Sequence, residues 1–139
     1  YQFMKNNSTS ERKILENVPN IRIVDGLECE KFSFQMTEEE KKERKEFYEN
    51  QFRMLTKMAC EEAFDVVFFD ELIYTIGAGL FSENLLLDFL KNKPKELEVI
   101  LTGQGPSSNL IEAADYVSEI RKINHPFDKG MPSRKGIEK

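Results

Sequence analysis

Short apolar runs alternate with helical patterns along this chain of 139 residues. Runs with the composition of β-strands occur at YQFM (1–4), IRIVD (21–25), VVFFD (66–70), LEVILT (97–102) and YVSEIR (116–121). Strands that alternate with helices in this way usually pair in parallel, with the helices as crossover connections. The pattern therefore predicts an α/β fold, and the length suits a single domain over residues 1–139.

The longest predicted helix begins at Thr37. Thr37 and Glu40 have the spacing of a capping box, in which each side chain accepts a hydrogen bond from the other residue's backbone amide. Apolar residues then recur at spacings of three and four, at Tyr48, Phe52, Leu55 and Ala59. This periodicity predicts one helical face packed against the sheet.

Two further helices are indicated by their capping residues. Ser82 precedes an apolar stretch that must end before Pro94, because proline lacks an amide hydrogen and does not continue a helix. Ser107 or Ser108 is placed to cap a third helix around LIEAAD. The tail from His125 onward has no periodicity and is predicted to be irregular.

Composition and charge exclude several classes of function. The chain carries 20 Lys and Arg against 25 Asp and Glu, and these basic residues are mixed with acids, so no general affinity for nucleic acid is expected. Cys29, Cys60 and the single histidine, His125, lie in unrelated contexts, which argues against a disulfide framework or a Cys/His metal cluster. The longest apolar stretch is interrupted by Asp70 and Glu71, so no membrane span is expected. Because the cysteines indicate no disulfide framework, a reducing cytoplasm fits best.

Two adjacent carboxylates, Asp70 and Glu71, follow the run VVFF at the predicted carboxyl end of a strand. Ligands of open parallel sheets bind beyond such strand ends. Because burial of an unpaired carboxylate is costly, the pair requires a cation, a basic side chain or several amide donors. Magnesium bridging to phosphate oxygens would supply that compensation. The alternative is that one acid caps the next helix and the other is solvated.

A glycine-containing turn, TGQG, follows the next predicted strand at residues 102–105. Its two glycines allow backbone amides to approach a ligand closely. The same glycines would also serve a tight turn between a strand and a helix, with no ligand. This second strand end therefore supports a ligand site without deciding the question.

Together these segments resemble the cobalamin-type ATP:corrinoid adenosyltransferases over nearly the whole chain. YQFMK (1–5) is similar to the family's VQF strand and the lysine after it, and DELIY (70–74) is similar to its DE-x-x-Y segment. NKP (92–94), TGQG (102–105) and ADYVSE (114–119) are similar to its N-x-P, its TG-x-G turn and the strand that follows. The tail NHPFDKGMPSRKGIE (124–138) is the most specific match, to HPFD-x-G followed by KGI.

The resemblance implies a RecA-like, P-loop-NTPase-type parallel sheet with helices on both faces. It implies ATP as co-substrate, Mg²⁺, and cob(I)alamin or another corrinoid as substrate. The 5′-deoxyadenosyl group of ATP would be transferred to cobalt(I) with release of triphosphate, in adenosylcobalamin biosynthesis or salvage. Asp70 and Glu71 are the implied metal ligands. The implied ATP-binding residues are Lys5, Glu71, Tyr74, Gly103 and Gln104.

The family's aromatic loop near the corrinoid corresponds to EKFSFQ (30–35), with Phe32 and Phe34 at its two aromatic positions. Two apolar rings on the lower face of cobalt would exclude water and the displaced base, which favours four-coordinate cobalt(I). Phe32 and Phe34 are therefore the implied corrinoid-binding and catalytic residues. From the residues alone, both also fit core positions on one side of a short extended segment.

The chain departs from the family pattern in one major respect. It contains no glycine-rich loop ending in Gly-Lys-Thr, which in the family lies upstream of the VQF strand and cradles the triphosphate. We therefore expect that the first strand and the P-loop are missing from this chain, and that these residues alone have little adenosyltransferase activity. Gln104 also stands where arginine is usual, and Lys31 and Phe34 replace the glycine and tryptophan of the aromatic loop.

The resemblance also implies a homodimer and a flavodoxin-type reductant as partners. The sequence is also compatible with two other functions. A Walker-B-type ATPase would release phosphate or diphosphate, whereas a non-catalytic corrinoid- or nucleotide-binding remnant would bind without turnover. Intact triphosphate together with a cobalt–carbon bond distinguishes the adenosyltransferase from both.

Overall fold

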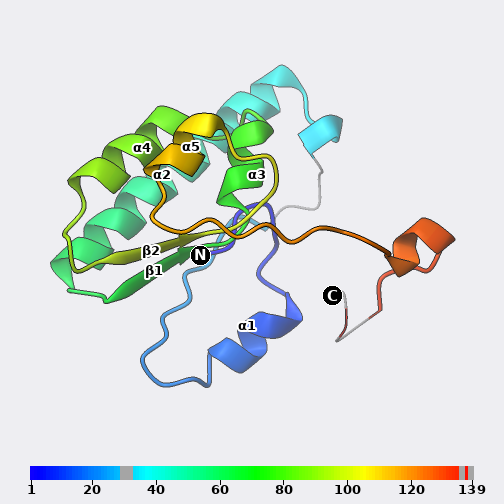
Figure 1. Cartoon of the computed structure of the whole chain (residues 1–139), viewed down its shortest axis with the longest axis horizontal. Coiled ribbons are helices and arrows are strands. Elements are labelled where there is room, and N and C mark those ends of the chain that lie inside the picture. The colour runs from blue at the N-terminus through cyan, green and yellow to red at the C-terminus, as the bar shows by residue number, and fades with distance from the viewer. Residues whose placement is uncertain (29–32, 135–136, 138–139) are drawn as a thin grey trace.

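The computed structural model describes residues 1–28, 33–134 and 137. Its helices and strands follow the order helix, helix, strand, helix, helix, strand, helix (Figure 1). They are α1 (Ser10–Leu15), α2 (Glu38–Glu61), β1 (Val66–Phe69), α3 (Leu72–Gly77), α4 (Glu83–Asn92), β2 (Glu98–Leu101) and α5 (Ser108–Ala113). Two short 3₁₀ helices, η1 (Ser33–Gln35) and η2 (Pro126–Lys129), complete the description.

The sheet is parallel, which confirms the α/β class. β1 pairs with β2 so that Val66 lies opposite Glu98 and Phe69 opposite Leu101. Residues 1–3 run along the other edge of β1: the Asp70 amide donates to the Tyr1 carbonyl, and the Phe3 amide donates to the Asp70 carbonyl, both at 2.9 Å. The N-terminal segment, β1 and β2 therefore lie side by side and end at the same edge.

Helix α2 follows the sequence prediction closely. Thr37 is its N-cap and forms a complete capping box with Glu40. The four apolar positions predicted to face the sheet are all buried: Tyr48, Phe52, Leu55 and Ala59. α4 likewise ends before Pro94, and Ser107 caps α5 by accepting a hydrogen bond from the Leu110 amide. These local signals are therefore confirmed.

Ser82 occupies the predicted N-cap position of α4 but makes no side-chain capping hydrogen bond. This difference gives a matched test of the capping box. Thr37→Ala is expected to lower the free energy of unfolding by about 1 kcal/mol, because it leaves an amide of the first turn without its acceptor. Ser82→Ala is expected to change it by only about 0.2 kcal/mol, since no capping bond is lost. Urea unfolding of both variants checks this prediction, and equal losses would contradict it.

An aromatic core joins the segments that frame the sheet. The ring of Phe3 lies edge-on to those of Tyr48, Phe69 and Phe81, with centroids 5.2 to 6.1 Å apart. The ring of Phe52 lies edge-on to that of Phe81 and is tilted by 43° to that of Phe69, with centroids 5.0 and 5.1 Å apart. Because aromatic rings bury large apolar areas, this cluster fixes α2 and the N-terminal segment against β1.

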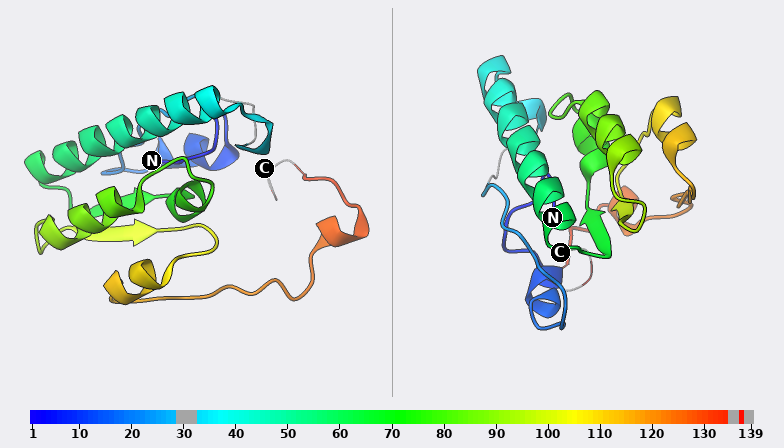
Figure 2. Two further views of the ribbon diagram at one scale, coloured as in Figure 1. Left: turned by 90° about the horizontal axis from the view of Figure 1, so that it is seen from above. Right: turned by 90° about the vertical axis from the view of Figure 1, so that its left-hand side faces the viewer.

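The two sides of the sheet are covered differently. Helices α2, α4 and α5 lie on one side of the strands, and α1 lies on the other (Figures 1 and 2). On the side of α1, the apolar side chains of Val66, Phe68 and Ile100 stay 45–47% exposed. The expectation of helices packed on both faces is therefore met on one face, whereas α1 stands across a cavity from the other.

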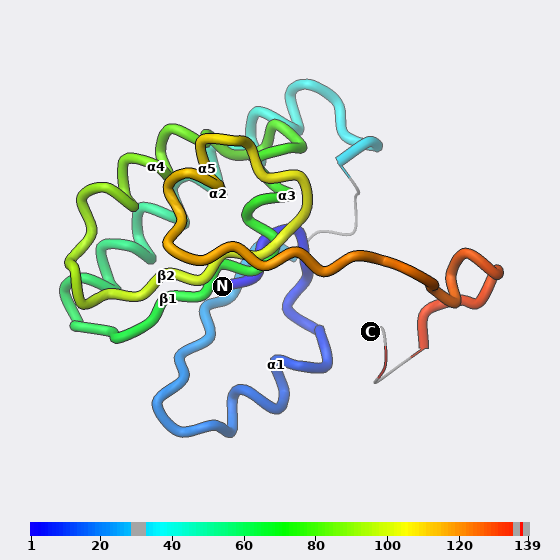
Figure 3. Tube along the Cα trace, in the orientation of Figure 1, coloured from blue at the N-terminus to red at the C-terminus, as the bar shows by residue number. Residues whose placement is uncertain are grey.

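The predicted strand at residues 1–4 is reduced to an isolated bridge between Gln2 and Asp70, and two other predicted strands are absent from the structure. Residues 21–25 have no strand pairing, and α1 is tied to them by an ion pair between Arg12 and Asp25. Residues 116–121 run as an exposed segment that leaves the body of the molecule after α5 (Figure 3). A strand requires a neighbouring strand for its backbone groups, and no described segment pairs with either stretch. Among the described residues, no helix is both long and apolar enough to cross a membrane.

Candidate functional site

Asp70 lies at the carboxyl end of β1, between the ends of its two neighbouring segments. The Nζ atom of Lys5 donates to Asp70 Oδ2 at 2.7 Å, and the Thr102 hydroxyl donates to Asp70 Oδ1 at 2.7 Å. Thr102 follows β2, so the carboxylate is held from both sides. The side chain of Asp70 is only 18% exposed. In this structure, the ammonium group of Lys5 and the hydroxyl of Thr102 compensate the negative charge of Asp70, whose partner was not known from the sequence.

Two residues that sequence reasoning did not identify complete this cluster. The side-chain amide nitrogen of Gln2, Nε2, donates to Asp70 Oδ2 at 3.2 Å and to Glu11 Oε1 at 2.8 Å. Lys5 Nζ also lies 3.5 Å from Glu11 Oε1. We call Gln2, Lys5, Glu11, Asp70 and Thr102 the strand-end cluster. The pairing of residues 1–3 with β1 brings Gln2 to Asp70, and only the expected parallel register could have indicated this contact.

The electrostatics of the cluster favour its charged form. Burial raises the pKa of Asp70, but the hydrogen bonds from Lys5 and Thr102 outweigh this effect and hold the pKa below its ordinary value. Burial likewise lowers the pKa of Lys5, but the hydrogen bond and charge of Asp70 raise it above its ordinary value. Asp70 and Lys5 therefore form a charged pair at neutral pH.

The carboxylate of Glu71 does not take part in the described contacts that hold Asp70. Its backbone is left-handed, with φ of 61° and ψ of 14°, and it occupies the N-cap position of α3 without a side-chain capping bond. Its amide donates to the Thr102 hydroxyl at 3.0 Å. Within the described residues, its carboxylate has no hydrogen bond or ion pair. The two predicted metal ligands therefore differ: Asp70 is engaged, whereas the carboxylate of Glu71 is available.

The turn after β2 packs against the start of α3. The Ile73 amide donates to the Thr102 carbonyl at 3.1 Å. Gly103 has a φ of +137°, and a Cβ atom there would lie 2.5 Å from the backbone nitrogen of Tyr74. This close approach explains the glycine. It also brings Gly103 and Tyr74, both predicted to bind ATP, into one place, with Gln104 exposed beside them.

The aromatic loop is only partly within the structure. Phe32 lies outside the described residues. Phe34 is in η1, and its side chain is 79% exposed, so the interpretation of Phe34 as a core residue is wrong. No described contact joins Phe34 to the strand-end cluster.

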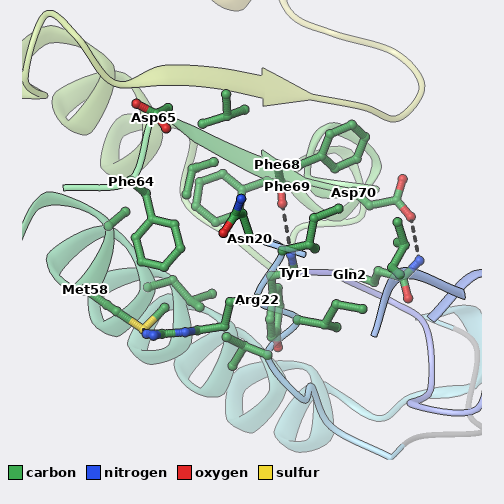
Figure 4. A pocket seen from close by; sticks show the side chains of 18 of the residues that line it. Tyr1, Gln2, Asn20, Arg22, Met58, Phe64, Asp65, Phe68, Phe69 and Asp70 are labelled. Atoms are coloured by element: carbon green, nitrogen blue, oxygen red, sulfur yellow. Dashed lines mark hydrogen bonds between the residues drawn. The ribbon is translucent and has the colours of Figure 1, made fainter. Parts of the chain in front are cut away.

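A cavity of about 880 Å³ lies beside the cluster, between the uncovered face of β1 and residues 20–24 (Figure 4). Val66 and Phe68 contribute to its wall from β1, and Arg22 and Phe64 face one another at 5.2 Å between guanidinium carbon and ring centroid. Asp70 lies at one end, where the Gln2 side chain points toward it (Figure 4). The strand end therefore borders the cavity.

The donor set of the strand end fits Mg²⁺ in kind. Carboxylate and hydroxyl oxygens are the hard ligands that Mg²⁺ prefers, and this ion usually takes one or two carboxylates together with phosphates and water. Asp70, Glu71 and Thr102 supply such oxygens within two adjacent strand ends. No group of three or more His, Cys, Asp or Glu in the described part of the chain is arranged as a self-sufficient metal site.

These features define an α/β protein with a charged polar site at the carboxyl ends of parallel strands. The family model of the ATP:corrinoid adenosyltransferases BtuR/CobO/CobP matches residues 1–138. The chain belongs to this family.

Curated relatives carry the same name. The corrinoid adenosyltransferase of Escherichia coli K12 is 33% identical over 82 residues, which are 59% of this chain and 42% of that protein. Corrinoid adenosyltransferase CobA of Salmonella typhimurium LT2 is 32% identical over the same shares. A corrinoid adenosyltransferase from a Sinorhizobium species is 34% identical over 56% of this chain and 37% of its own length. The matched region therefore spans less than half the length of these relatives.

Proposed function

We propose that the chain acts in the transfer of the 5′-deoxyadenosyl group from ATP to cobalt(I) of a corrinoid. The observation that carries this proposal is the charged strand-end cluster around Asp70, in a chain that belongs to the ATP:corrinoid adenosyltransferase family. In the reaction, the electron pair of cobalt(I) forms a bond to C5′ of the ribose, the C5′–O bond breaks, and triphosphate leaves with its electrons. No protein nucleophile is required.

The role of the protein is then to align the carbon with the metal and to stabilise the departing charge. Asp70 and Glu71 would hold Mg²⁺, directly or through water, and the bound ion would neutralise the triphosphate oxygens. Lys5, Tyr74, Gly103 and Gln104 would line the nucleotide. Support comes from Gly103, whose close approach to Tyr74 joins the two strand ends. Phe32 and Phe34 would face the corrinoid, and the exposure of Phe34 supports this role.

Other features of the proposal follow from family membership. We propose that residues 1–139 form one adenosyltransferase domain of the RecA-like, P-loop-NTPase type that works in the cytoplasm. Its partners would be a second copy of the chain and a flavodoxin-type reductant. The sequence contains no Gly-Lys-Thr loop, which would normally cradle the triphosphate.

We predict that the 139-residue chain transfers the adenosyl group slowly. Joining it to a segment that carries a glycine-rich Gly-Lys-Thr loop is expected to raise the rate on the order of 100-fold or more, because several backbone donors to the departing charge are restored. Anaerobic assays with reduced corrinoid, Mg²⁺ and ATP measure both proteins by formation of the cobalt–carbon bond. A rate of the chain alone close to that of the joined protein would contradict this prediction.

A further inference from the structure

Two donors in the strand-end cluster are each shared between the same two carboxylates. Lys5 Nζ lies 2.7 Å from Asp70 Oδ2 and 3.5 Å from Glu11 Oε1. Gln2 Nε2 lies 3.2 Å from Asp70 Oδ2 and 2.8 Å from Glu11 Oε1. The same two oxygen atoms are thus bridged twice. The other oxygen of Asp70 is bound by Thr102, from a different segment of the chain.

This arrangement gives Lys5 a second acceptor within its present reach. A movement of the ammonium group toward Glu11 would exchange its shorter contact for the longer one, so the lysine would keep a carboxylate partner. Gln2 is already closer to Glu11 than to Asp70, and it can follow without losing its shorter bond. The hydroxyl of Thr102 binds the other oxygen of Asp70, so this bond takes no part in the exchange. The exchange would therefore free Asp70 Oδ2 while Lys5 and Gln2 each keep a carboxylate acceptor.

We propose that Lys5 is a displaceable counter-ion of Asp70, and that Glu11 is the residue that receives it when Asp70 becomes a metal ligand. This inference rests on the proposed function, which makes Asp70 a ligand of the divalent ion. Lys5 neutralises Asp70 while the site holds no metal, and this prevents a partly buried bare carboxylate. Glu11, which the sequence did not single out, becomes a positioning residue for Lys5.

The test measures binding of Mn²⁺ alone, as a spectroscopic substitute for Mg²⁺, by the electron paramagnetic resonance signal of the free ion. Lys5→Met is expected to tighten Mn²⁺ binding by roughly threefold, because a partly exposed ion-pair partner no longer competes for Asp70. Glu11→Gln is expected to weaken it by roughly threefold, because Lys5 loses its alternative acceptor. Lys13→Met and Glu16→Gln change the same charges at exposed positions of the same region, and they are expected to leave binding nearly unchanged.

A double-mutant cycle separates exchange from simple charge effects. If Glu11 acts by receiving Lys5, Glu11→Gln has little effect on Mn²⁺ binding in the Lys5→Met background. If Lys5 and Glu11 act only through the electrostatic effect of their charges on the metal, the fold-change in Mn²⁺ affinity of the double variant equals the product of the two single fold-changes. That result would overturn the proposal. Thermal unfolding of each variant without metal shows whether the fold is retained. If Lys5→Met or Glu11→Gln fails to fold, Lys5→Gln or Glu11→Ala, which remove the same charges, takes its place in the cycle.

Failure of the proposed function is recognised separately. If Asp70→Asn leaves Mn²⁺ binding unchanged, Asp70 is not the metal ligand, and both its proposed metal-binding role and the counter-ion proposal are overturned, whereas adenosyl transfer itself is tested by its products. If Asp70→Asn abolishes binding while the Lys5 and Glu11 variants behave like their controls, only the counter-ion proposal is overturned. Tightening by Lys5→Met, weakening by Glu11→Gln and their non-additivity together support it.

Discussion

Gly103→Ala is expected to destabilise the protein by about 3 kcal/mol, through strain and overpacking together. The φ of Gly103 is +137°, and its added Cβ would lie 2.5 Å from the backbone nitrogen of Tyr74 and 2.9 Å from Cβ of Ile73. The first contact is with backbone at the start of α3, which cannot rotate aside. The turn after β2 must therefore move away from α3, and the hydrogen bond from the Ile73 amide to the Thr102 carbonyl is stretched.

Gly105 in the same turn is the matched control. Its φ is also positive, at +69°, but nothing lies within 4 Å of an added Cβ atom. Gly105→Ala is expected to cost only about 1 kcal/mol, from backbone strain alone. Urea unfolding of the two variants and the unsubstituted protein measures the difference. Equal destabilisation by both would show that the close approach at Gly103 does not constrain the turn.

The second large effect is expected at Asp70. Asp70→Asn is predicted to weaken binding of Mn²⁺ in the presence of ATP on the order of 100-fold, since removal of even an outer-shell partner costs about 10–100-fold in metal affinity. The substitution keeps the size of the side chain and its hydrogen bond with Thr102. It removes the negative charge that both Lys5 and a metal ion require.

Asp65→Asn is the control for this prediction. Asp65 precedes the same strand, so it lies at the opposite end of β1, and it is exposed. Its substitution changes the net charge equally and is expected to leave metal binding nearly unchanged. Electron paramagnetic resonance titrations of the two variants measure the affinities. A comparable weakening by Asp65→Asn would mean that overall charge, and not the strand-end site, controls binding.

The sequence predicted the features that depend on neighbouring residues. The capping box at Thr37 and the apolar period of α2 need only positions three or four apart, and both are present. The position of Asp70 beside Thr102 follows from the rule that parallel strands end at one edge. These interactions are local, or they follow from strand order alone.

Other features depend on contacts between distant segments. Lys5 pairs with Asp70 across 65 positions of sequence, a contact that no local pattern indicates. The strand propensity of residues 21–25 and 116–121 was real, but strands form only where a neighbouring strand completes their hydrogen bonds. The left-handed backbone of Glu71, which separates its role from that of Asp70, also had no signal in the residue types.

The chemical identity of the products tests the central claim most directly. Purified protein, incubated anaerobically with reduced corrinoid, Mg²⁺ and ATP, is analysed for adenosylated cobalt and for the phosphate species released. The proposed function predicts that intact triphosphate and the cobalt–carbon bond accumulate slowly and in equal amounts. Release of phosphate or diphosphate without adenosylated corrinoid, or saturable corrinoid binding with no product, would contradict it.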